Sequence, residues 1–249
     1  MINLKTEKEI EIMREGGKIL AEIIKKVADA VKPGITTNDL ERLARELLLS
    51  YGAESSFLGF ENYPAVLCTS LNDEIVHGVP SDRILKDGDL LKIDMGVLHN
   101  GFHTDSAVTV LVGNGGDMLK RKLIQITKES LEIGISMARA GNTLGDVGSA
   151  IQRYVEDKGF NVVRDLVGHG IGRKLHEPPQ VLNYGKAGQG EKLVSGMAIA
   201  IEPMVVTGKW GIKNGRDGYA FVTKDGGLAA HFEHTVVVTD SGPDILTLR

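Results

Sequence analysis

Apolar and polar positions follow two periods along the chain, and the first of them predicts a pair of helices. Thr6 and Glu9 have the spacing of a helix capping box and open a run whose apolar residues recur every three or four positions as far as Val27. The same period follows Thr37 and stops at Gly52. We therefore predict two amphipathic helices at the start of the chain.

Strands follow the helices, and the order then repeats. Strand-like segments lie at 65–70, 89–99 and 102–113. Two more helical segments and three more strand-like segments come next, at 117–140, 143–159, 196–206, 219–225 and 228–238. Because no linker rich in Pro, Ser or Gly divides the repeat, we expect one domain, 1–249, with similar halves at about 1–113 and 114–249. A site shared between the halves is expected.

The Asn-Gly pair at 100–101 fixes the pairing of two strands. These residues supply the positive φ angles of a two-residue type I′ turn. Counting back from this turn pairs Asp94 with Ala107, so Asp94 and Asp105 share a face and lie diagonally opposite each other. The alternate residues of both strands are apolar, so the opposite face of the sheet is apolar.

Two close carboxylates with no basic residue between them repel, and one of them would take up a proton. A divalent cation removes that conflict, and carboxylate oxygens suit Mg, Ca, Mn or Fe. The alternative is a pair of solvated acids on an exposed sheet face, and the hairpin alone slightly favours that alternative.

Three further residues shift the balance towards a metal site. Glu202 follows an apolar strand, where a charge is costly unless it is paired or metal-bound. Glycines around His169 suit a close approach of the backbone to a site, and Glu233 provides another acid. With Asp94 and Asp105, these residues are enough to hold two ions with a bridging water.

Composition excludes several classes of protein. The formal net charge is -4 and there is no long run of Lys and Arg, which argues against a dedicated nucleic-acid binder. The first residues lack the apolar stretch of a signal peptide, and no run is long enough to span a membrane. Cys68 is the only cysteine, so no intramolecular disulfide can form, and we expect a cytoplasmic location.

Familiar motifs are absent or incomplete. The sequence HEPPQ at 176–180 begins like a zinc-protease HExxH helix, but it lacks the second His and carries two prolines. No GxSxG occurs. The glycine-rich segment 185–192 has Glu191 where a phosphate loop needs Lys, so we interpret it as a surface loop.

The candidate ligands, in their sequence context, resemble the metal site of methionine aminopeptidases. The resemblance rests on the segments KIDMGV, GFHTDSA, GHGIGR, IEPM and FEHT. The segment NDEIVHGVP at 72–80 fits the same family, and the match runs in order over nearly the whole chain. The short interval between Glu202 and Glu233 resembles the type I branch in its minimal bacterial form. This resemblance implies the α/β pita-bread fold, in which two pseudo-symmetric halves place a β-sheet between flanking helices.

The resemblance also implies the cofactor and its ligands. Two divalent ions (Co, Mn, Fe or Zn) would be held, with Asp94 on one ion, Asp105 and Glu233 bridging, and His169 and Glu202 on the second. The implied reaction is attack of a metal-activated water on the first peptide bond, which releases methionine when the second residue is small.

Three residues would then act on the substrate. Glu202 is the candidate general base, and the resemblance implies that His77 contacts the leaving nitrogen and His176 the carbonyl oxygen. The alternative for both histidines is an ordinary surface or core position.

A small apolar pocket would accept the unbranched thioether. The matching positions are Phe57, Phe60, Tyr63, Cys68, Leu175 and Tyr219. Phe57 stands where Cys is common in the family, Leu175 where Phe is usual and Tyr219 where Trp is usual, which puts the pocket shape in doubt. Core packing is the alternative role for each, and for Phe60 the two roles are equally supported.

The implied partners are the N-termini of nascent polypeptides. The resemblance allows ribosome association, and we expect no direct nucleic-acid specificity, no membrane contact and a monomer. A proline-specific aminopeptidase or dipeptidase of the same fold is the nearest rival, but such enzymes usually carry a preceding domain for which this chain has no room. A pita-bread protein that has lost catalysis and only binds peptides or ribosomes is the other rival, and it would have no need of all five ligands.

Overall fold

The helices of the computed structural model, which describes residues 2–249, begin where the sequence provides caps. They are α1 (Glu7–Asp29), α2 (Thr37–Tyr51), the short 3₁₀ helix at Phe60–Asn62, α3 (Met118–Met137) and α4 (Leu144–Asp157). The Thr6 side chain accepts from the backbone of Glu9, whose carboxylate accepts from the backbone of Thr6, and the same capping box opens α2 and α4. All four predicted helices are confirmed. α3 ends at Met137, a few residues before the predicted limit at 140.

The strands form one large sheet and two small ones. The large sheet has the order β1-β4-β5-β14-β9-β7-β8, with β2 on β4 and β15 on β14, and the small sheets are β13-β10-β6 and β11-β12-β3. The bounds are β1 Glu54–Ser55, β2 Cys68–Leu71, β3 Glu74–Val76, β4 Leu90–His99, β5 Phe102–Leu111, β6 Asn161–Val162, β7 Gly168–Gly170, β8 Glu177–Val181, β9 Ala198–Ile201, β10 Met204–Val206, β11 Ile212–Asn214, β12 Phe221–Thr223, β13 Ala229–His231, β14 Glu233–Thr239 and β15 Gly242–Ile245.

The β4–β5 hairpin has the predicted register. Asn100 and Gly101 have φ angles of 48° and 81°, as a type I′ turn requires. Asp94 pairs with Ala107, and Asp105 lies opposite Gly96. The two acids therefore share a face of the sheet, and this prediction is confirmed.

Two segments that were each predicted to be one strand are in fact two strands, so these predictions are wrong. The segment 196–206 divides at Glu202-Pro203 into β9 and β10, and the segment 228–238 divides at Phe232 into β13 and β14. β9 and β14 pair in the large sheet, whereas β10 and β13 pair in a small one. Pro203 has no N–H to donate to a ladder, which favours a break at this position. The two segments therefore leave the large sheet side by side and pair again in the small one.

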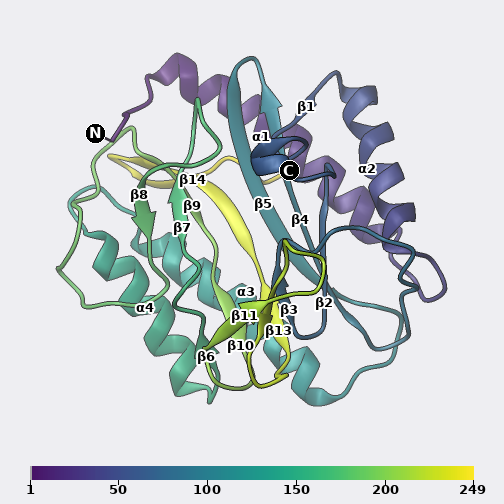
Figure 1. Cartoon of the computed structure of the whole chain (residues 1–249). Helices are drawn as coiled ribbons and strands as arrows, with labels where there is room; N and C mark the ends of the chain where they lie inside the picture. Colours follow the sequence, from purple (N-terminus) through teal and green to yellow (C-terminus); the bar gives the residue numbers. More distant parts are fainter. Residues whose placement is uncertain (1) are drawn as a thin grey trace.

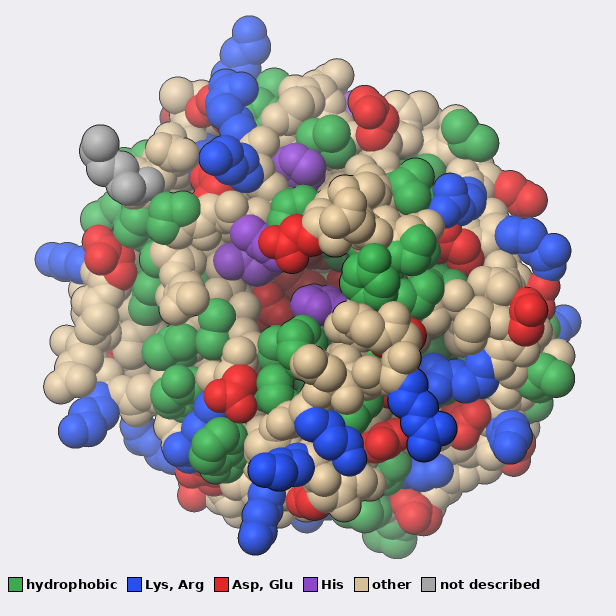
Figure 2. Space-filling view, in the orientation of Figure 1, with side chains coloured by type: hydrophobic (Ala, Val, Ile, Leu, Met, Phe, Trp, Pro, Cys, Tyr) green, Lys and Arg blue, Asp and Glu red, His purple; other side chains and the backbone are tan. Residues whose placement is uncertain are grey.

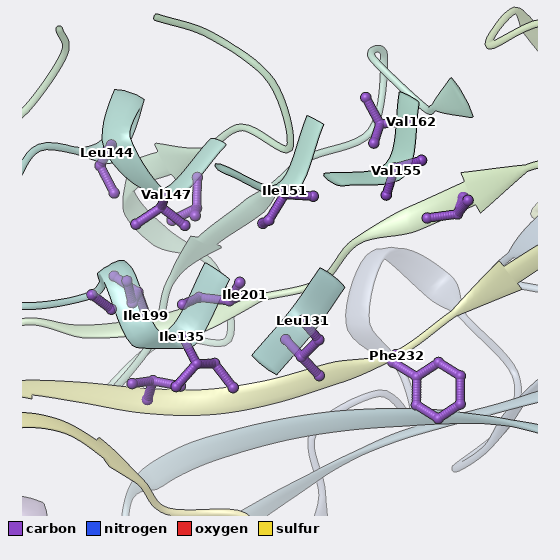
Figure 3. Packing of buried hydrophobic residues seen from close by; sticks show 14 of the residues in the cluster. Leu131, Ile135, Leu144, Val147, Ile151, Val155, Val162, Ile199, Ile201 and Phe232 are labelled. Carbon is purple, nitrogen blue, oxygen red and sulfur yellow. The ribbon is translucent and has the colours of Figure 1, made fainter. Parts of the chain in front are cut away.

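Two pairs of helices cover the outer face of the large sheet (Figure 1). α1 and α2 bury a cluster that includes Leu91, Ile93, Met95 and Val97 of β4. α3 and α4 bury a second cluster, part of which is drawn in Figure 3, with Ile199 and Ile201 of β9 and with Val236 and Val238 of β14. Since side chains alternate along a strand, the residues between these apolar positions point to the inner face. The arrangement is the mixed α/β fold that the sequence predicted. Within residues 2–249, no helix combines the length and the apolar character of a membrane span.

Gly17 provides a test of the packing of α1. A β-carbon at this position would lie 2.2 Å from the backbone oxygen of Leu246, so neither partner can move aside as a flexible side chain would. We expect Gly17→Ala to destabilise the fold by about 1–3 kcal/mol, as overpacking typically does. A thermal melt of Gly17→Ala measures the loss. Gly211→Ala, whose β-carbon would meet nothing closer than 3.8 Å, is the matched control. Equal melting temperatures for the two variants would contradict the close contact.

Candidate metal centre and active site

A pocket opens on the inner face of the large sheet. Figure 2 shows a hollow near the middle of this view, where acidic and histidine side chains gather beside apolar ones. Its volume is about 150 Å³. The lining residues are Phe57, Phe60, Glu61, Tyr63, Cys68, His77, Asp94, Asp105, His169, Leu175, His176, Glu202, Tyr219 and Glu233. Every site residue that the sequence predicted is among them.

Five neighbouring strands each contribute one side chain to the pocket floor. In sheet order these strands are β4, β5, β14, β9 and β7. They carry, in the same order, Asp94, Asp105, Glu233, Glu202 and His169, with Glu202 placed directly after the last residue of β9. The backbone ladder therefore fixes the spacing of residues that are far apart in the sequence.

Three of the five side chains come close enough to share a cation. Ligand atoms of Asp105, His169 and Glu233 all lie within 4.8 Å of one another. Nε2 of His169 is 3.7 Å from Oε1 of Glu202. The distances of this group fit a compact metal centre rather than a row of separate acids.

Burial and mutual repulsion dominate the electrostatics of the floor. Burial raises the pKa of Asp94, Glu202 and Glu233 well above the usual range, and the neighbouring carboxylates raise it further. Burial likewise raises the pKa of Asp105, to about 7. Within residues 2–249, Oδ1 of Asp94 and Oε1 of Glu233 are buried without a hydrogen-bond partner. A hard divalent cation would give these oxygens the partner that they lack, so the donor set fits a metal site.

His169 is prepared to act as a ligand by its own backbone. Its Nδ1 lies 2.9 Å from the carbonyl oxygen of Gly170. Because a carbonyl only accepts, Nδ1 carries the proton and Nε2 presents a free lone pair towards the acids. Burial lowers the pKa of His169 to about 4, which keeps the ring neutral.

His77 and His176 form part of the pocket wall. The ring of His176 packs edge-on against His169 at 4.3 Å and Phe60 at 5.1 Å between centroids. His77 follows β3 with a backbone φ of 62°. Residues other than glycine rarely adopt this conformation, and it recurs at functional sites. Burial lowers the pKa of His77 to about 4, and it also lowers that of His176. Both rings are therefore neutral groups that can donate one hydrogen bond.

The apolar wall of the pocket, formed by Phe57, Tyr63, Cys68, Leu175 and Tyr219, has its tyrosine hydroxyls hydrogen-bonded within the protein. The Tyr63 hydroxyl is 3.0 Å from the carbonyl oxygen of Gly78, and the Tyr219 hydroxyl donates to Asn62 at 2.8 Å. The two tyrosine rings pack edge to face at 5.4 Å. Cys68 pairs with Asp94 across β2 and β4, and burial raises the pKa of its thiol. The wall thus presents aromatic faces and a neutral thiol, together with Phe57 and Leu175.

Two residues near the predicted site were missed. Glu61 lines the pocket from the 3₁₀ turn at Phe60–Asn62, where its φ is 48°. His231 is buried behind the floor, with Nε2 3.6 Å from Oε2 of Glu202 and 4.0 Å from Oε2 of Glu233. Burial lowers the pKa of His231 to about 3. Its position two residues before Glu233 was the only available signal, because residues two apart in a strand share a face.

Comparisons with known proteins agree with this geometry. The sequence profile of metallopeptidase family M24 matches residues 11–240. The methionine aminopeptidase of Clostridium perfringens is 51% identical over 248 residues, which cover 100% of this chain and 99% of that one. The crystal structure of methionine aminopeptidase from Thermotoga maritima superposes with a TM-score of 0.98 at 44% identity and full coverage of both chains. A prolidase structure from Pyrococcus horikoshii shares the fold, with a TM-score of 0.79 at 23% identity over 98% of this chain and 63% of that one.

The buried acids make the stability of the metal-free protein depend on pH. Because the pKa of Asp105 is raised to about 7, the folded protein keeps a proton that the unfolded chain has already lost. The folded state binds more protons, so stability falls as pH rises from about 4 to about 7, by up to about 1.4 kcal/mol per pH unit for one such group. We expect Asp105→Asn to flatten this slope in denaturant titrations with a chelator present. Asp240→Asn, an exposed control, should keep the wild-type slope. Identical slopes for wild type and Asp105→Asn would show that the raised pKa is wrong.

Proposed function

The chain belongs to metallopeptidase family M24, and on that premise we propose that it removes N-terminal methionine from polypeptides whose second residue is small. As a family member it is a hydrolase that uses divalent metal. One observation carries the proposal: five adjacent strands deliver four carboxylates and one imidazole to the floor of a small apolar pocket. The full-length similarity to methionine aminopeptidases supports the assignment of the substrate.

We propose that the floor holds two divalent ions, chosen from Mn, Fe, Co and Zn. Asp94 would coordinate one ion, and His169 and Glu202 would coordinate the other. Asp105 and Glu233 would coordinate both ions. When bound, the ions polarise the scissile carbonyl and lower the pKa of a shared water towards neutrality. Mixed carboxylate and imidazole donors accept each of these metals.

Glu202 is the proposed general base. Its carboxylate lies at the floor of the pocket and is almost buried, with 13% of the side chain exposed. Burial raises its pKa, which gives the group the basicity to take a proton from water and to retain it until the leaving nitrogen needs one.

His77 and His176 are the proposed groups that contact the substrate. Both line the pocket, and both are neutral because burial lowers their pKa. We propose that His176 donates to the carbonyl oxygen as negative charge develops there, and that His77 donates to the leaving nitrogen. Neutral rings supply these hydrogen bonds without adding a charge to the buried site.

The apolar wall is the proposed pocket for the methionine side chain. An unbranched thioether is flexible and polarisable, and it packs well against aromatic faces. Tyr63 and Tyr219 have their hydroxyls engaged with backbone carbonyls, so the rings offer apolar surface to the ligand. Phe57, Cys68 and Leu175 would complete this surface.

The proposed setting is the cytoplasm, with nascent polypeptides as partners and ribosome association as a further proposal. The buried, free thiol of Cys68 is consistent with a reducing compartment. All five proposed ligands come from one chain, so we propose a monomer. We also propose that 1–249 acts as one catalytic unit with pseudo-symmetric halves at about 1–113 and 114–249.

A substrate comparison tests the proposal directly. Protein reloaded with each metal in turn should hydrolyse Met-Ala-Ser and leave Ala-Pro peptides largely intact. Glu202→Gln should lower kcat by about 10²–10⁴-fold, because an amide cannot accept the proton. Glu191→Gln, an exposed glutamate, is the control and should be fully active. Preferential cleavage of the proline peptides would overturn the substrate assignment, and full activity of Glu202→Gln would overturn its role as the base.

A second comparison tests the pocket wall. Phe57 packs at the pocket against Gly96 of β4, and removing its ring should widen the space for the first residue. We expect Phe57→Ala to raise kcat/KM for Leu-Ala-Ser relative to Met-Ala-Ser by about 10-fold or more. Leu58→Ala, at the exposed neighbouring position, should leave the ratio unchanged. An unchanged ratio in Phe57→Ala would remove Phe57 from the pocket.

A further inference from the structure

His231 is fixed in place by its backbone. It ends β13, where it pairs with Met204 of β10. Its N–H donates to Oγ1 of Thr109 at 2.9 Å, and the same hydroxyl donates to the His231 carbonyl at 2.7 Å. With 1% of its surface exposed, the residue has little freedom to place its ring elsewhere.

The ring of His231 has unused hydrogen-bonding capacity. Within the described part of the chain, neither ring nitrogen has a hydrogen-bond partner. Leaving a buried polar group without a partner is costly, and native structures keep few of them without a reason. Two carboxylate oxygens lie near Nε2: Oε2 of Glu202 at 3.6 Å and Oε2 of Glu233 at 4.0 Å.

Glu202 lies between two imidazoles that differ in what they can donate. On one side, Oε1 faces Nε2 of His169 at 3.7 Å. That nitrogen has no proton to give, because Nδ1 of His169 already donates to Gly170. On the other side, Oε2 faces Nε2 of His231, whose tautomer is not fixed by any such bond. Of these two imidazoles, His231 is the one that can donate to the carboxylate.

We propose that His231 is a positioning residue for Glu202. In this role, the Nε2–H of His231 closes the 3.6 Å separation and donates to Oε2. The contact would hold the carboxylate plane and leave Oε1 directed towards His169 and the pocket. His231 is not among the residues that line the pocket, so it acts through Glu202 rather than on the substrate. Hydrogen bonds of this kind to ligating carboxylates and imidazoles tune metal affinity and basicity. The inference rests on the proposed function for its setting, but its main measurement is metal binding.

Mn²⁺ titration by calorimetry tests the role in variants of the full chain. His231→Leu removes the donor at similar size and should weaken Mn²⁺ binding by about 10–100-fold. His231→Gln restores a donor and should recover most of that affinity. In peptide assays, His231→Leu should lower kcat for Met-Ala-Ser while changing KM little, since the residue does not contact the substrate.

His234→Leu is the matched control. His234 is also a largely buried histidine next to the acidic floor, but its Nδ1 lies 2.9 Å from Oγ1 of Thr247 and it does not line the pocket. It should retain wild-type Mn²⁺ affinity. If both leucine variants lose affinity equally, the effect is general loosening of the fold and the proposal is wrong. Wild-type affinity in His231→Leu also overturns it.

A spectroscopic test on the wild type does not depend on any variant folding. In the ¹⁵N spectrum of histidine-labelled, Zn²⁺-loaded protein, Nε2 of His231 should have the shift of a protonated ring nitrogen. A metal-bound shift at Nε2 would make His231 a direct ligand and would overturn the positioning role. If wild type fails to cleave Met-Ala-Ser but His231→Leu still weakens Mn²⁺ binding, the proposed function fails and the positioning of Glu202 stands.

Discussion

Confining four carboxylates to one buried pocket floor is the constraint on which the rest of the structure depends. Each acid would prefer water, and each raises the pKa of its neighbours. The fold holds them by giving every acid its own strand or strand end, so that ladder hydrogen bonds rather than side-chain contacts set the spacing. The two helix pairs stabilise this arrangement from the outer face, where their apolar clusters lie directly behind the charged floor. A divalent cation would relieve this mutual repulsion.

The parts of the site that local rules govern could be predicted from the sequence. The Asn100-Gly101 turn sets one register, and alternation along the strands then places Asp94 and Asp105 on the same face. The capping boxes likewise mark the helix starts within a residue or two. The gathering of His169, Glu202 and Glu233 has no local cause. Their sequence context only made them candidates, and the family resemblance supported placing them in one site. The breaks at Pro203 and Phe232 were missed because they depend on the pairing of β10 with β13, strands that are distant in sequence.

The same limit explains His231. Its sequence context suggests one continuous strand into Glu233, yet β13 and β14 belong to different sheets. Only the fold shows that its ring reaches behind the floor to Glu202. The pocket wall is a different case, since the family resemblance supplied its residues and no local pattern did. Tyr63 and Tyr219 line the pocket with hydroxyls bound to the backbone of Gly78 and Asn62.

The central place of β14 ties two distant groups of side chains into one unit. This strand runs from Glu233 to Thr239 and inserts between β5 and β9 in the middle of the sheet. Asp94 and Asp105 lie on strands to one side of it, whereas Glu202 and His169 come from strands on the other side. Contacts of such long sequence separation slow folding, because the intervening chain must be ordered first. The two groups of side chains therefore meet only when β14 takes its place between them.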